Sequence, residues 1–248
     1  MKPIDIFITA YLRPEYTQKT LEYLYARTRY PFRVWLLDNG GNKQVAMRMQ
    51  QDHADSFHHI EFNENLGIHA AWNVALALAE SEYFITSDND IYVPDWTNNH
   101  TDWLEALKRY MDIMPDYGAI SLHPHVFIGA AGIDPNDPED VKDRNMCGAV
   151  MRIMRREAVQ KAGGWEHKIE PGRNHEERTI CSRLHDAGYK TGITSRIRAY
   201  HPFGGEKGNW GYPEEITPEM QGHNPQLKDY VKSFDHPESY DQNTWLPL

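Results

Sequence analysis

No apolar run in this 248-residue sequence is long enough to cross a membrane, and cysteine occurs only at Cys147 and Cys181. A membrane-spanning helix needs about 20 consecutive apolar residues. The first apolar run, residues 4–10, contains Asp5 and is too short for a signal peptide. The two cysteines form neither a CxxC pair nor a disulfide framework. We therefore expect a cytoplasmic protein, soluble or bound peripherally to a membrane, whose cysteines are small buried side chains.

The sequence also lacks the two glycine-rich motifs that most often bind nucleotides. Neither a P-loop nor a GxGxxG segment is present, which excludes the usual kinases, ATPases and dinucleotide-dependent dehydrogenases. Positive charge is scarce as well, because 26 Lys and Arg face 36 Asp and Glu and the formal net charge is −10. Such a surface repels polyanions and argues against a nucleic-acid partner. The same surplus provides carboxylates, which are hard ligands for divalent cations.

Hydrophobic residues make up 40% of the chain and aromatic residues 12%, enough for a sizeable core. Apolar segments alternate between β-branched runs and helical periodicity. Strands are predicted at residues 4–9, 32–37, 60–62, 83–87 and 119–122, with a strand-like segment at 197–200, and apolar character returns at 148–152. Helices are predicted from residue 14 to about 29, at 45–51, after residues 65–67 with an apolar face at 71–78, and at 96–114, 156–162 and 176–187. This alternation predicts an α/β fold with a mostly parallel central sheet flanked by helices.

Three stretches stand apart from this alternation. Residues 123–145 are rich in proline, glycine and aspartate without periodicity, so we expect a functional loop or a disordered one. Residues 203–248 are rich in proline, glycine and aromatic residues and could form a lid, a lip for an acceptor or an extended arm. Basic residues gather at Arg152, Arg155, Arg156 and Lys161, either as a groove for a phosphorylated acceptor or, as the pattern favours, as a solvated helix face.

Polar clusters follow three of the predicted strands, at residues 9–11, 38–40 and 88–90. Ligands of parallel sheets bind at the carboxyl ends of the strands. Because alternate residues of an extended segment face the same way, Asp88 and Asp90 could present two carboxylates to one Mg²⁺ or Mn²⁺. The alternative for this pair is a solvated turn. Three such clusters at one rim predict a ligand site.

Other side chains near this rim have both a functional and a structural interpretation. Asp38 could accept hydrogen bonds from a base or ribose, or form an Asx turn. Tyr11 could stack on a flat base, or pack at the edge of the core. Glu176 and Glu177 stand at a helix start, where one could be a general base or both could complement the helix dipole. His201 ends a strand and could complete an octahedral metal site.

The order of these motifs resembles the family 2 glycosyltransferases, inverting enzymes of the GT-A fold that use nucleotide-diphospho-sugars. The resemblance covers about residues 3–202 and begins at 8–14 (ITAYLRP), similar to the family's strand-Thr-x-Tyr-Asn-Arg opening except that Leu12 replaces the usual Asn. The further matching segments are 37–41 (LDNGG), 63–73, the DxD region 87–90 (SDND) with 93–96 (VPDW), 148–165 and 176–189.

This resemblance implies a role for each matched residue. It implies that the nucleotide-sugar is bound by Thr9, Tyr11, Arg13, Asp38, Asn65, Asn73, Asp88 and Asn89. It also implies that Asp90 and His201 hold the metal, with Asp88 close by. The second acid of the family's Glu-Asp helix, its catalytic base, corresponds here to Glu177, one methylene longer, and Glu176 stays open as the alternative.

The resemblance further implies the reaction and its partners. The expected enzyme is a metal-dependent inverting glycosyltransferase using Mn²⁺ or Mg²⁺ and a nucleotide-diphospho-sugar, by family frequency a UDP-sugar. Because the Gln-x-x-Arg-Trp motif of processive synthases is missing, a single addition is expected. The acceptor hydroxyl could belong to a glycan, a lipid-linked glycan, a protein or a modified nucleic-acid base. Residues 1–95 would form a nucleotide-binding half and 96–202 an acceptor half of one domain.

Two other functions stay open on the sequence. A sugar-1-phosphate nucleotidylyltransferase shares a similar sheet, but it would need a glycine-rich basic loop directly after the first strand, and residues 9–12 are not one. A catalytically silent module that binds a nucleotide-sugar or a carbohydrate would keep the fold but point Glu177 away from the pocket.

Overall fold

The computed structural model describes residues 2–94, 101–125, 129, 130, 134, 136–165 and 176–201. The strands are β1 (Ile4–Ala10), β2 (Phe32–Asp38), β3 (Phe57–Glu61), β4 (Tyr83–Asp88), β5 (Tyr117–His125), β6 (Gly129–Ala130), β7 (Val141–Asp143), β8 (Arg152–Arg155) and β9 (Lys190–Tyr200). The helices are α1 (Pro14–Arg27), α2 (Lys43–Asp52), α3 (Gly67–Leu78), α4 (Trp103–Ile113), α5 (Arg156–Lys161) and α6 (Glu176–Asp186), with a 3₁₀ turn at Pro138–Asp140.

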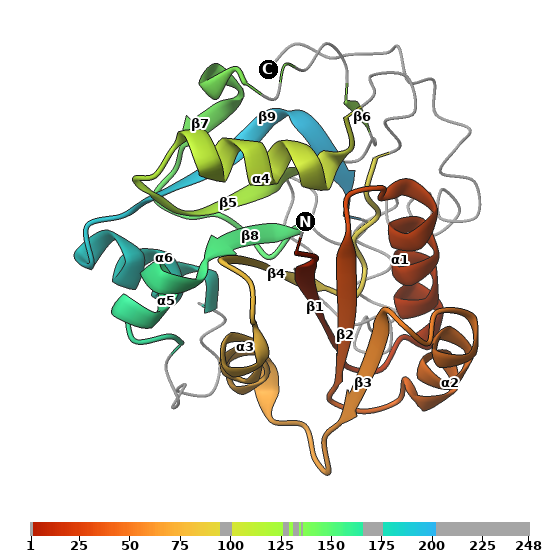
Figure 1. Ribbon diagram of the computed structural model, residues 1–248. Coiled ribbons are helices and arrows are strands. Elements are labelled where there is room, and N and C mark those ends of the chain that lie inside the picture. Colours follow the sequence, from red (N-terminus) through yellow and green to blue (C-terminus); the bar gives the residue numbers. More distant parts are fainter. Residues whose placement is uncertain are drawn as a thin grey trace, which may run out of the picture.

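Within the described residues these strands form one sheet with the order β3-β2-β1-β4-β8-β5-β9-β6, and β7 pairs with β9 (Figure 1). The β1–β2, β1–β4, β2–β3 and β5–β9 pairs are parallel, whereas β8 runs antiparallel to both β4 and β5. The sheet is therefore parallel in its first half and mixed in its second. No crossover helix joins β5 to β8 in the described part of the chain, and an antiparallel pairing needs none.

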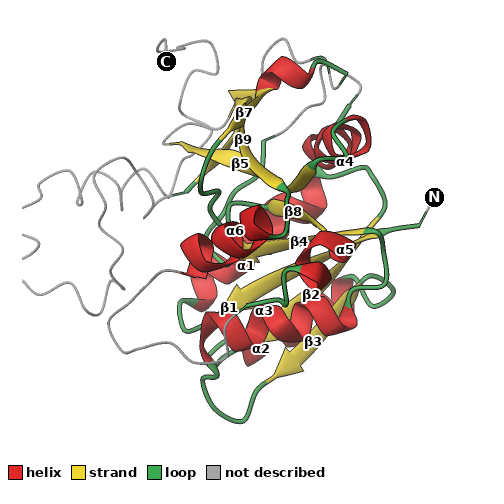
Figure 2. Cartoon of the chain, turned by 90° about the vertical axis from the view of Figure 1, so that its left-hand side faces the viewer, coloured by secondary structure: helices red, strands yellow, loops and turns green. Residues whose placement is uncertain are grey.

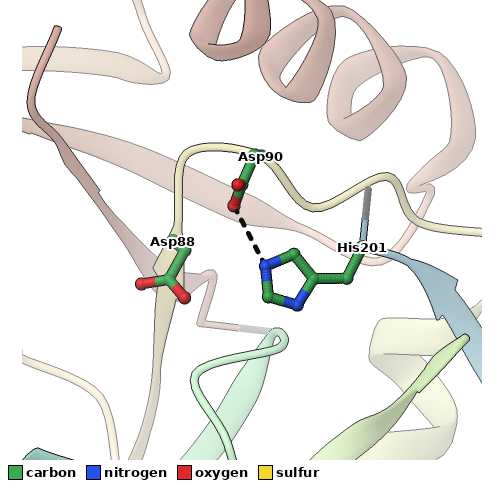
Figure 3. Close-up of side chains that lie close together, drawn as sticks. All are labelled: Asp88, Asp90 and His201. Carbon is green, nitrogen blue, oxygen red and sulfur yellow. Dashed lines mark ion pairs between the residues drawn. The ribbon is translucent and has the colours of Figure 1, made fainter. Parts of the chain in front are cut away.

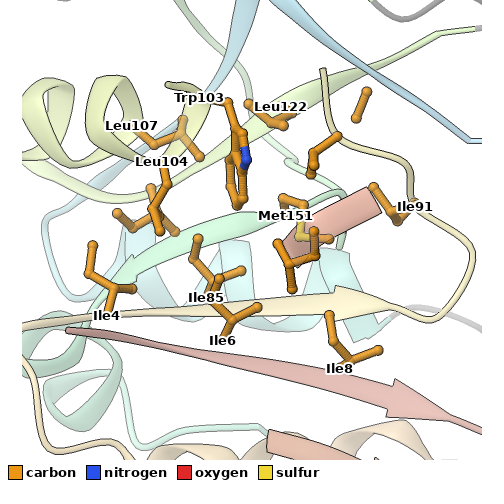
Figure 4. Packing of buried hydrophobic residues seen from close by; sticks show 14 of the residues in the cluster. Ile4, Ile6, Ile8, Ile85, Ile91, Trp103, Leu104, Leu107, Leu122 and Met151 are labelled. Carbon is orange, nitrogen blue, oxygen red and sulfur yellow. The ribbon is translucent and has the colours of Figure 1, made fainter. Parts of the chain in front are cut away.

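Helices cover both faces of the sheet, as Figures 1 and 2 show. Alternation along β1 assigns its side chains, since Ile4, Ile6 and Ile8 join the core beneath α1, α2 and α4 (Figure 4), whereas Phe7 joins the core beneath α3, α5 and α6. Asp5 is buried on the second face, where it accepts hydrogen bonds from the Arg33 and Trp35 side chains and the Glu80 backbone. The predicted α/β fold with a covered sheet is confirmed.

Several element boundaries differ from those predicted. The helix predicted at 96–114 begins at Trp103, because Asp102 has extended backbone and caps the helix; residues 95–100 lie outside the described part. Residues 123–145 are not a structureless loop: β5 runs to His125, and β6 and β7 pair with β9. Strands of two or three residues are too short to produce a periodic pattern, so β6 and β7 cannot be predicted from the sequence.

The register of the parallel strands aligns the three predicted clusters at one edge of the sheet. Thr9 of β1 is paired with Asp88 of β4, and Ala10 of β1 is paired with Asp38 of β2. The chain segments that follow these strands therefore leave the sheet side by side. The predicted C-terminal extension, residues 203–248, lies outside the described residues. None of the helices in the described part is long and apolar enough to span a bilayer.

A single buried carboxylate fixes the start of α4, and its removal should weaken the fold. Asp102 accepts from the Glu105 backbone N–H at 2.8 Å and also from the backbone N–H groups of Arg29 and Tyr30. We expect Asp102→Ala to lower the free energy of unfolding by about 2–4 kcal/mol, because buried donors lose their acceptor. Urea unfolding followed by circular dichroism measures it. Asp102→Asn, which keeps one carbonyl oxygen, should cost less, and an unchanged midpoint for Asp102→Ala would contradict the assignment.

Candidate active site

Two carboxylates and one imidazole meet at the carboxyl end of β4. The ligand atoms of Asp88, Asp90 and His201 all lie within 4.8 Å of one another (Figure 3). Asp88 ends β4, Asp90 lies two residues on, and His201 follows β9. His201 is brought to this place by an isolated antiparallel bridge, in which the Tyr92 and Tyr200 backbone N–H groups each donate to the other's carbonyl at 2.9 Å. The pairing of distant segments thus completes the group.

Asp90 is buried between two basic groups. Its Oδ1 lies 3.4 Å from His201 Nε2, and its Oδ2 lies 3.2 Å from Arg13 Nη1. Burial by itself raises the pKa of Asp90, but His201 and Arg13 outweigh burial and hold that pKa below its usual value. Burial by itself lowers the pKa of His201, but the charges of Asp90, Asp88 and Glu177 reverse this and raise it. The site therefore holds mutually stabilised charges in a dry environment.

The donor set fits a divalent cation. Carboxylate oxygens suit Mg²⁺ and Mn²⁺, and imidazole nitrogen is a common ligand of first-row transition metals. Two ligand atoms on one Mg²⁺ lie at most about 4.2 Å apart, since each bond is about 2.1 Å long. The ligand atoms must therefore approach one another before a single ion could contact all three, and a pair 4.8 Å apart would have to close by at least about half an ångström. Among the described residues this is the only group of three or more such ligands.

Glu177 is tied to the same region through the backbone of one residue, Ala149. Its Oε1 accepts a hydrogen bond from the Ala149 N–H at 3.1 Å, and the Ala149 carbonyl accepts from the Asp88 N–H at 3.1 Å. A Cβ on Gly148 would lie 3.2 Å from Glu177 Oε1, so the absence of a side chain there permits this close approach. The structure therefore brings Glu177 to the group formed by Asp88, Asp90 and His201. Of Glu176, the first residue of α6, only the backbone is described.

Asp38 organises the turn after β2. Its Oδ1 accepts from the Gly40 N–H at 2.8 Å and from Asn42 Nδ2 at 3.2 Å, and its Oδ2 accepts from the Asn42 N–H at 3.1 Å. Burial raises the pKa of Asp38, but hydrogen bonds from His59, Gly40 and Asn42 outweigh burial and lower it. The Asp38 side chain is 1% exposed. The contacts of Asp38 are thus those of an Asx turn.

Tyr11, Thr9 and Asn65 surround this turn. A Cβ on Gly40 would lie 3.7 Å from the Tyr11 ring, so the aromatic ring borders the turn. Thr9 Oγ1 is buried and has no hydrogen-bond partner in the described part of the chain. Asn65 is exposed, and its Oδ1 accepts from the Gly67 N–H at 2.9 Å. Asn39, which the sequence reasoning did not single out, fixes the neighbouring segment by accepting from the Leu66 N–H at 3.0 Å.

The side chains of Asn73 and Asn89 make hydrogen bonds to other residues of the protein. Asn73 exchanges two hydrogen bonds of 3.0 Å with the Trp165 backbone. Asn89 is buried and donates from Nδ2 to Thr17 Oγ1 at 2.8 Å. Thr17 also went unnoticed in the sequence, although a threonine on the apolar face of a helix signals a buried hydrogen bond. The predicted contacts of Asn73 and Asn89 with a nucleotide stay predictions.

Arg152 lies in the core, so both sequence interpretations of it are wrong. The residue is 0% exposed, and its guanidinium stacks 4.7 Å from the Trp72 ring. Nε and Nη2 donate to Thr86 Oγ1, and Nη1 donates to the Cys147 carbonyl. Arg152 belongs to strand β8 and not to a helix. Because side chains alternate between the two faces of a sheet and both faces are covered here, its side chain points into the core. Cys147 and Cys181 are free and buried, as predicted.

Comparison with protein families places these observations in context. The model of the family described as Glycosyl transferase family 2 matches residues 5–163. A comparison with curated proteins finds no match. Among solved structures, the mannosyltransferase PcManGT from Pyrobaculum calidifontis, in complex with GDP-Man and Mn²⁺, superposes with a TM-score of 0.65 at 16% identity, covering 96% of this chain and 75% of that one.

Two further solved structures share the fold. TarS 1-349 of S. aureus in complex with UDP-GlcNAc gives a TM-score of 0.59 at 14% identity and covers 99% of this chain and 77% of that one. GalNAc-T7 with UDP, GalNAc and Mn²⁺ gives 0.64 at 13% identity and covers 97% of this chain and 53% of that one. At these identities the likeness establishes the GT-A fold.

Backbone strain gathers beside the site and can be relieved at one position. Leu12 and Arg13 both have left-handed backbone, with φ of 54° and 50°. Asn tolerates this conformation far better than a branched apolar residue. Because Leu12 is 39% exposed, we expect Leu12→Asn to raise the melting temperature by about 2–4 °C, which corresponds to about 1 kcal/mol. Differential scanning calorimetry measures the change.

Leu12→Ala is the matched control for this prediction. It removes the same exposed side chain but keeps a Cβ and therefore keeps the backbone strain. A gain in Leu12→Asn that Leu12→Ala does not reproduce would assign it to the backbone. A melting temperature lowered by Leu12→Asn would show that the Leu12 side chain stabilises the turn more than its conformation costs.

Proposed function

This chain belongs to glycosyl transferase family 2, and from that membership we propose that it transfers a sugar from a nucleotide-diphospho-sugar to an acceptor hydroxyl with inversion, with a divalent cation at Asp88, Asp90 and His201. The observation that carries this proposal is the convergence of those three ligands beside Glu177. Transfer of a sugar from a nucleoside diphosphate needs a positive charge at the leaving diphosphate and a base at the acceptor hydroxyl. The site offers residues for each of these two tasks.

The metal ligands and Arg13 would handle the negative charge of the donor. Mn²⁺ or Mg²⁺ bound at this site would neutralise the charge that develops on the departing nucleoside diphosphate. Asp90 and His201 are 5% and 4% exposed, so they are held in place by their surroundings. Arg13, 3.2 Å from Asp90, supplies a further positive charge at the same edge. The electrostatic interactions of this site act in a largely water-excluded setting, where they are strong.

Glu177 is the residue that we assign as the base. Its Oε1 is held by the Ala149 N–H, and no described residue binds its Oε2. The free oxygen would take the proton of the acceptor hydroxyl as that hydroxyl attacks the anomeric carbon. Attack from the face opposite the diphosphate inverts the configuration. The hydrogen bonds through Ala149 would hold Glu177 at a fixed position relative to Asp88.

The nucleoside would lie on the turn after β2. The Tyr11 ring offers a stacking surface, and the unpartnered Thr9 hydroxyl offers a hydrogen bond. The Asp38 turn would present backbone groups of residues 39–41, and Asn65 lies on the adjoining exposed segment. PcManGT was solved with GDP-Man and TarS with UDP-GlcNAc. We assign a UDP-sugar as the donor, with GDP-sugars as the comparison in every assay.

The two sides of the site would divide the work along the chain. Residues 1–95 contribute Thr9, Tyr11, Asp38 and the aspartate pair, and so form the donor side. Residues 96–202 contribute Glu177 and His201, and so form the acceptor side. A single sugar would be added to a hydroxyl of a glycan, a lipid-linked glycan, a protein or a modified nucleic-acid base.

Metal-dependent nucleotide binding is the first test. At a concentration of UDP about 100 times its Kd, stabilisation of about 2.7 kcal/mol is expected, which corresponds to a rise of about 5–10 °C in melting temperature. We expect this rise with Mn²⁺ and its loss with EDTA, measured by thermal shift with UDP and GDP in parallel. Asp90→Asn, which keeps the size of the side chain, should abolish the rise. An equal rise in EDTA would contradict the metal assignment.

Loss of the base is the second test. We expect Glu177→Gln to lower the rate of sugar transfer by about 10²–10⁴-fold, because general base catalysis contributes about that factor. The amide oxygen of Gln can still accept from Ala149, so nucleotide-dependent thermal shifts should persist. Transfer is measured by release of UDP from the donor. The exposed Glu157→Gln of α5 is the matched control and should behave like the unaltered protein.

Two outcomes would contradict this assignment. Full activity of Glu177→Gln would remove Glu177 from the role of base. Nucleotide-sugar binding by the unaltered protein, without transfer to any acceptor and without donor hydrolysis over long incubation, would favour a catalytically silent binding module.

A further inference from the structure

A chain of four buried polar side chains runs from the metal-ligand segment to the turn after β2. Asn89 Nδ2 donates to Thr17 Oγ1 at 2.8 Å, and Thr17 Oγ1 donates to Asn42 Oδ1 at 2.7 Å. Asn42 Nδ2 then donates to Asp38 Oδ1 at 3.2 Å. Thr17 lies on α1 between the two loops. The chain therefore joins segments that are separate in the sequence.

The Asp38 carboxylate at one end of this chain determines the direction of every hydrogen bond in it. The ionised carboxylate of Asp38 can only accept, so Asn42 must present its NH₂ group to it. The Oδ1 of Asn42 then faces Thr17 and can only accept, so the Thr17 hydroxyl must donate to it. Thr17 in turn must accept from Asn89, which fixes the orientation of the Asn89 amide. One arrangement of donors and acceptors satisfies all four groups.

Burial makes this arrangement hard to disturb. Asp38, Asn42 and Thr17 are 0% exposed and Asn89 is 8% exposed, so water does not replace a lost partner. The Asn89 carbonyl is also held, because Thr20 Oγ1 of α1 donates to it at 2.8 Å. Movement of either loop would leave a buried amide without a partner. The two loops are thus mechanically joined through α1.

The two ends of the chain lie at the two halves of the donor site. Asp38 and Asn42 shape the turn that carries Gly40 beside the Tyr11 ring, where the nucleoside would lie. Asn89 stands between Asp88 and Asp90, which would hold the metal. We propose that Thr17 is a positioning residue that couples nucleoside binding at the turn after β2 to cation binding at Asp88 and Asp90. This inference rests on the proposed function.

The coupling acts through restraint of the loops. A nucleoside that orders residues 39–42 holds Asn42 in the position where it accepts from Thr17, and Thr17 then holds Asn89 and the aspartates on either side of it. Thermodynamic linkage requires that the cation strengthens nucleoside binding by the same factor. Thr17 itself would contact neither ligand.

A nucleoside without phosphates separates this coupling from direct contact between a cation and a diphosphate. Mn²⁺ binding is measured by electron paramagnetic resonance of the free ion, with and without a saturating nucleoside, run once with uridine and once with guanosine. We expect the nucleoside to tighten Mn²⁺ binding by about fivefold in the unaltered protein, the lower end of typical couplings. We expect Thr17→Val, which has a similar shape and no hydroxyl, to reduce this factor to about one.

Three further variants distinguish coupling from general weakening. Thr17→Ser restores the hydroxyl and should restore the factor. Thr28→Val is the matched control, because Thr28 is a buried threonine at the other end of α1 whose hydroxyl accepts from Trp103 Nε1 at 2.9 Å. It should lower stability but keep the fivefold factor. Asn89→Ala breaks the chain at its metal end, leaves the Thr17–Asn42 bond intact, and should remove the factor even if Thr17→Val fails to fold.

Each outcome decides the inference. A fivefold factor that persists in Thr17→Val or in Asn89→Ala overturns the coupling and leaves the proposed function standing. A factor of one in the unaltered protein, with Mn²⁺ and the nucleoside each bound, also overturns only the coupling. If the unaltered protein binds neither Mn²⁺ nor nucleoside, the proposed function itself fails and the coupling fails with it.

Discussion

The bridge between Tyr92 and Tyr200 is the interaction on which the site depends. Two backbone hydrogen bonds of 2.9 Å pair the segment after the DxD turn with the end of β9, and this pairing sets His201 against Asp90. The Tyr92 ring is buried, lies against the Tyr200 ring and stacks on Tyr23 of α1 at 4.9 Å between centroids. Packing of these rings excludes water from the bridge, which strengthens its hydrogen bonds and makes their loss costly. The last described strand is therefore a structural part of the candidate site.

Burial of the Asp90 carboxylate beside this bridge costs free energy unless a nearby positive charge compensates it. Asp90 meets this requirement with His201 on one oxygen and Arg13 on the other. Arg13 reaches Asp90 from a left-handed backbone position at the start of α1, so the strain of that turn serves the placement of a positive charge. The net charge of −10 therefore says little about this site, because the charge of Asp90 is compensated locally by His201 and Arg13.

The sequence predicted what depends on local pattern and missed what depends on distant partners. β-branched runs located β1, β2 and β4, and the rule that parallel strands end at one edge brought Thr9, Asp38 and Asp88 together correctly. The inward orientation of Asn73 and Asn89 follows from Trp165 and Thr17, which no local pattern connects to them. Arg152 was misread for a similar reason: a buried guanidinium needs Trp72 and a carbonyl acceptor, and both come from elsewhere in the chain.

Helical periodicity, by contrast, predicts that Glu177 lies on the core-facing side of α6. In α6 the buried residues Ile180, Cys181 and Leu184 define the face that packs against the sheet. Glu177 precedes them by three, four and seven residues, the spacing of one helix face, whereas Glu176 is displaced from that face by about 100°. A carboxylate on the core-facing side of a first helical turn needs a polar partner, and the Ala149 N–H provides it. The extra methylene of Glu relative to Asp lengthens the reach of the side chain from the start of α6 to the backbone of Ala149.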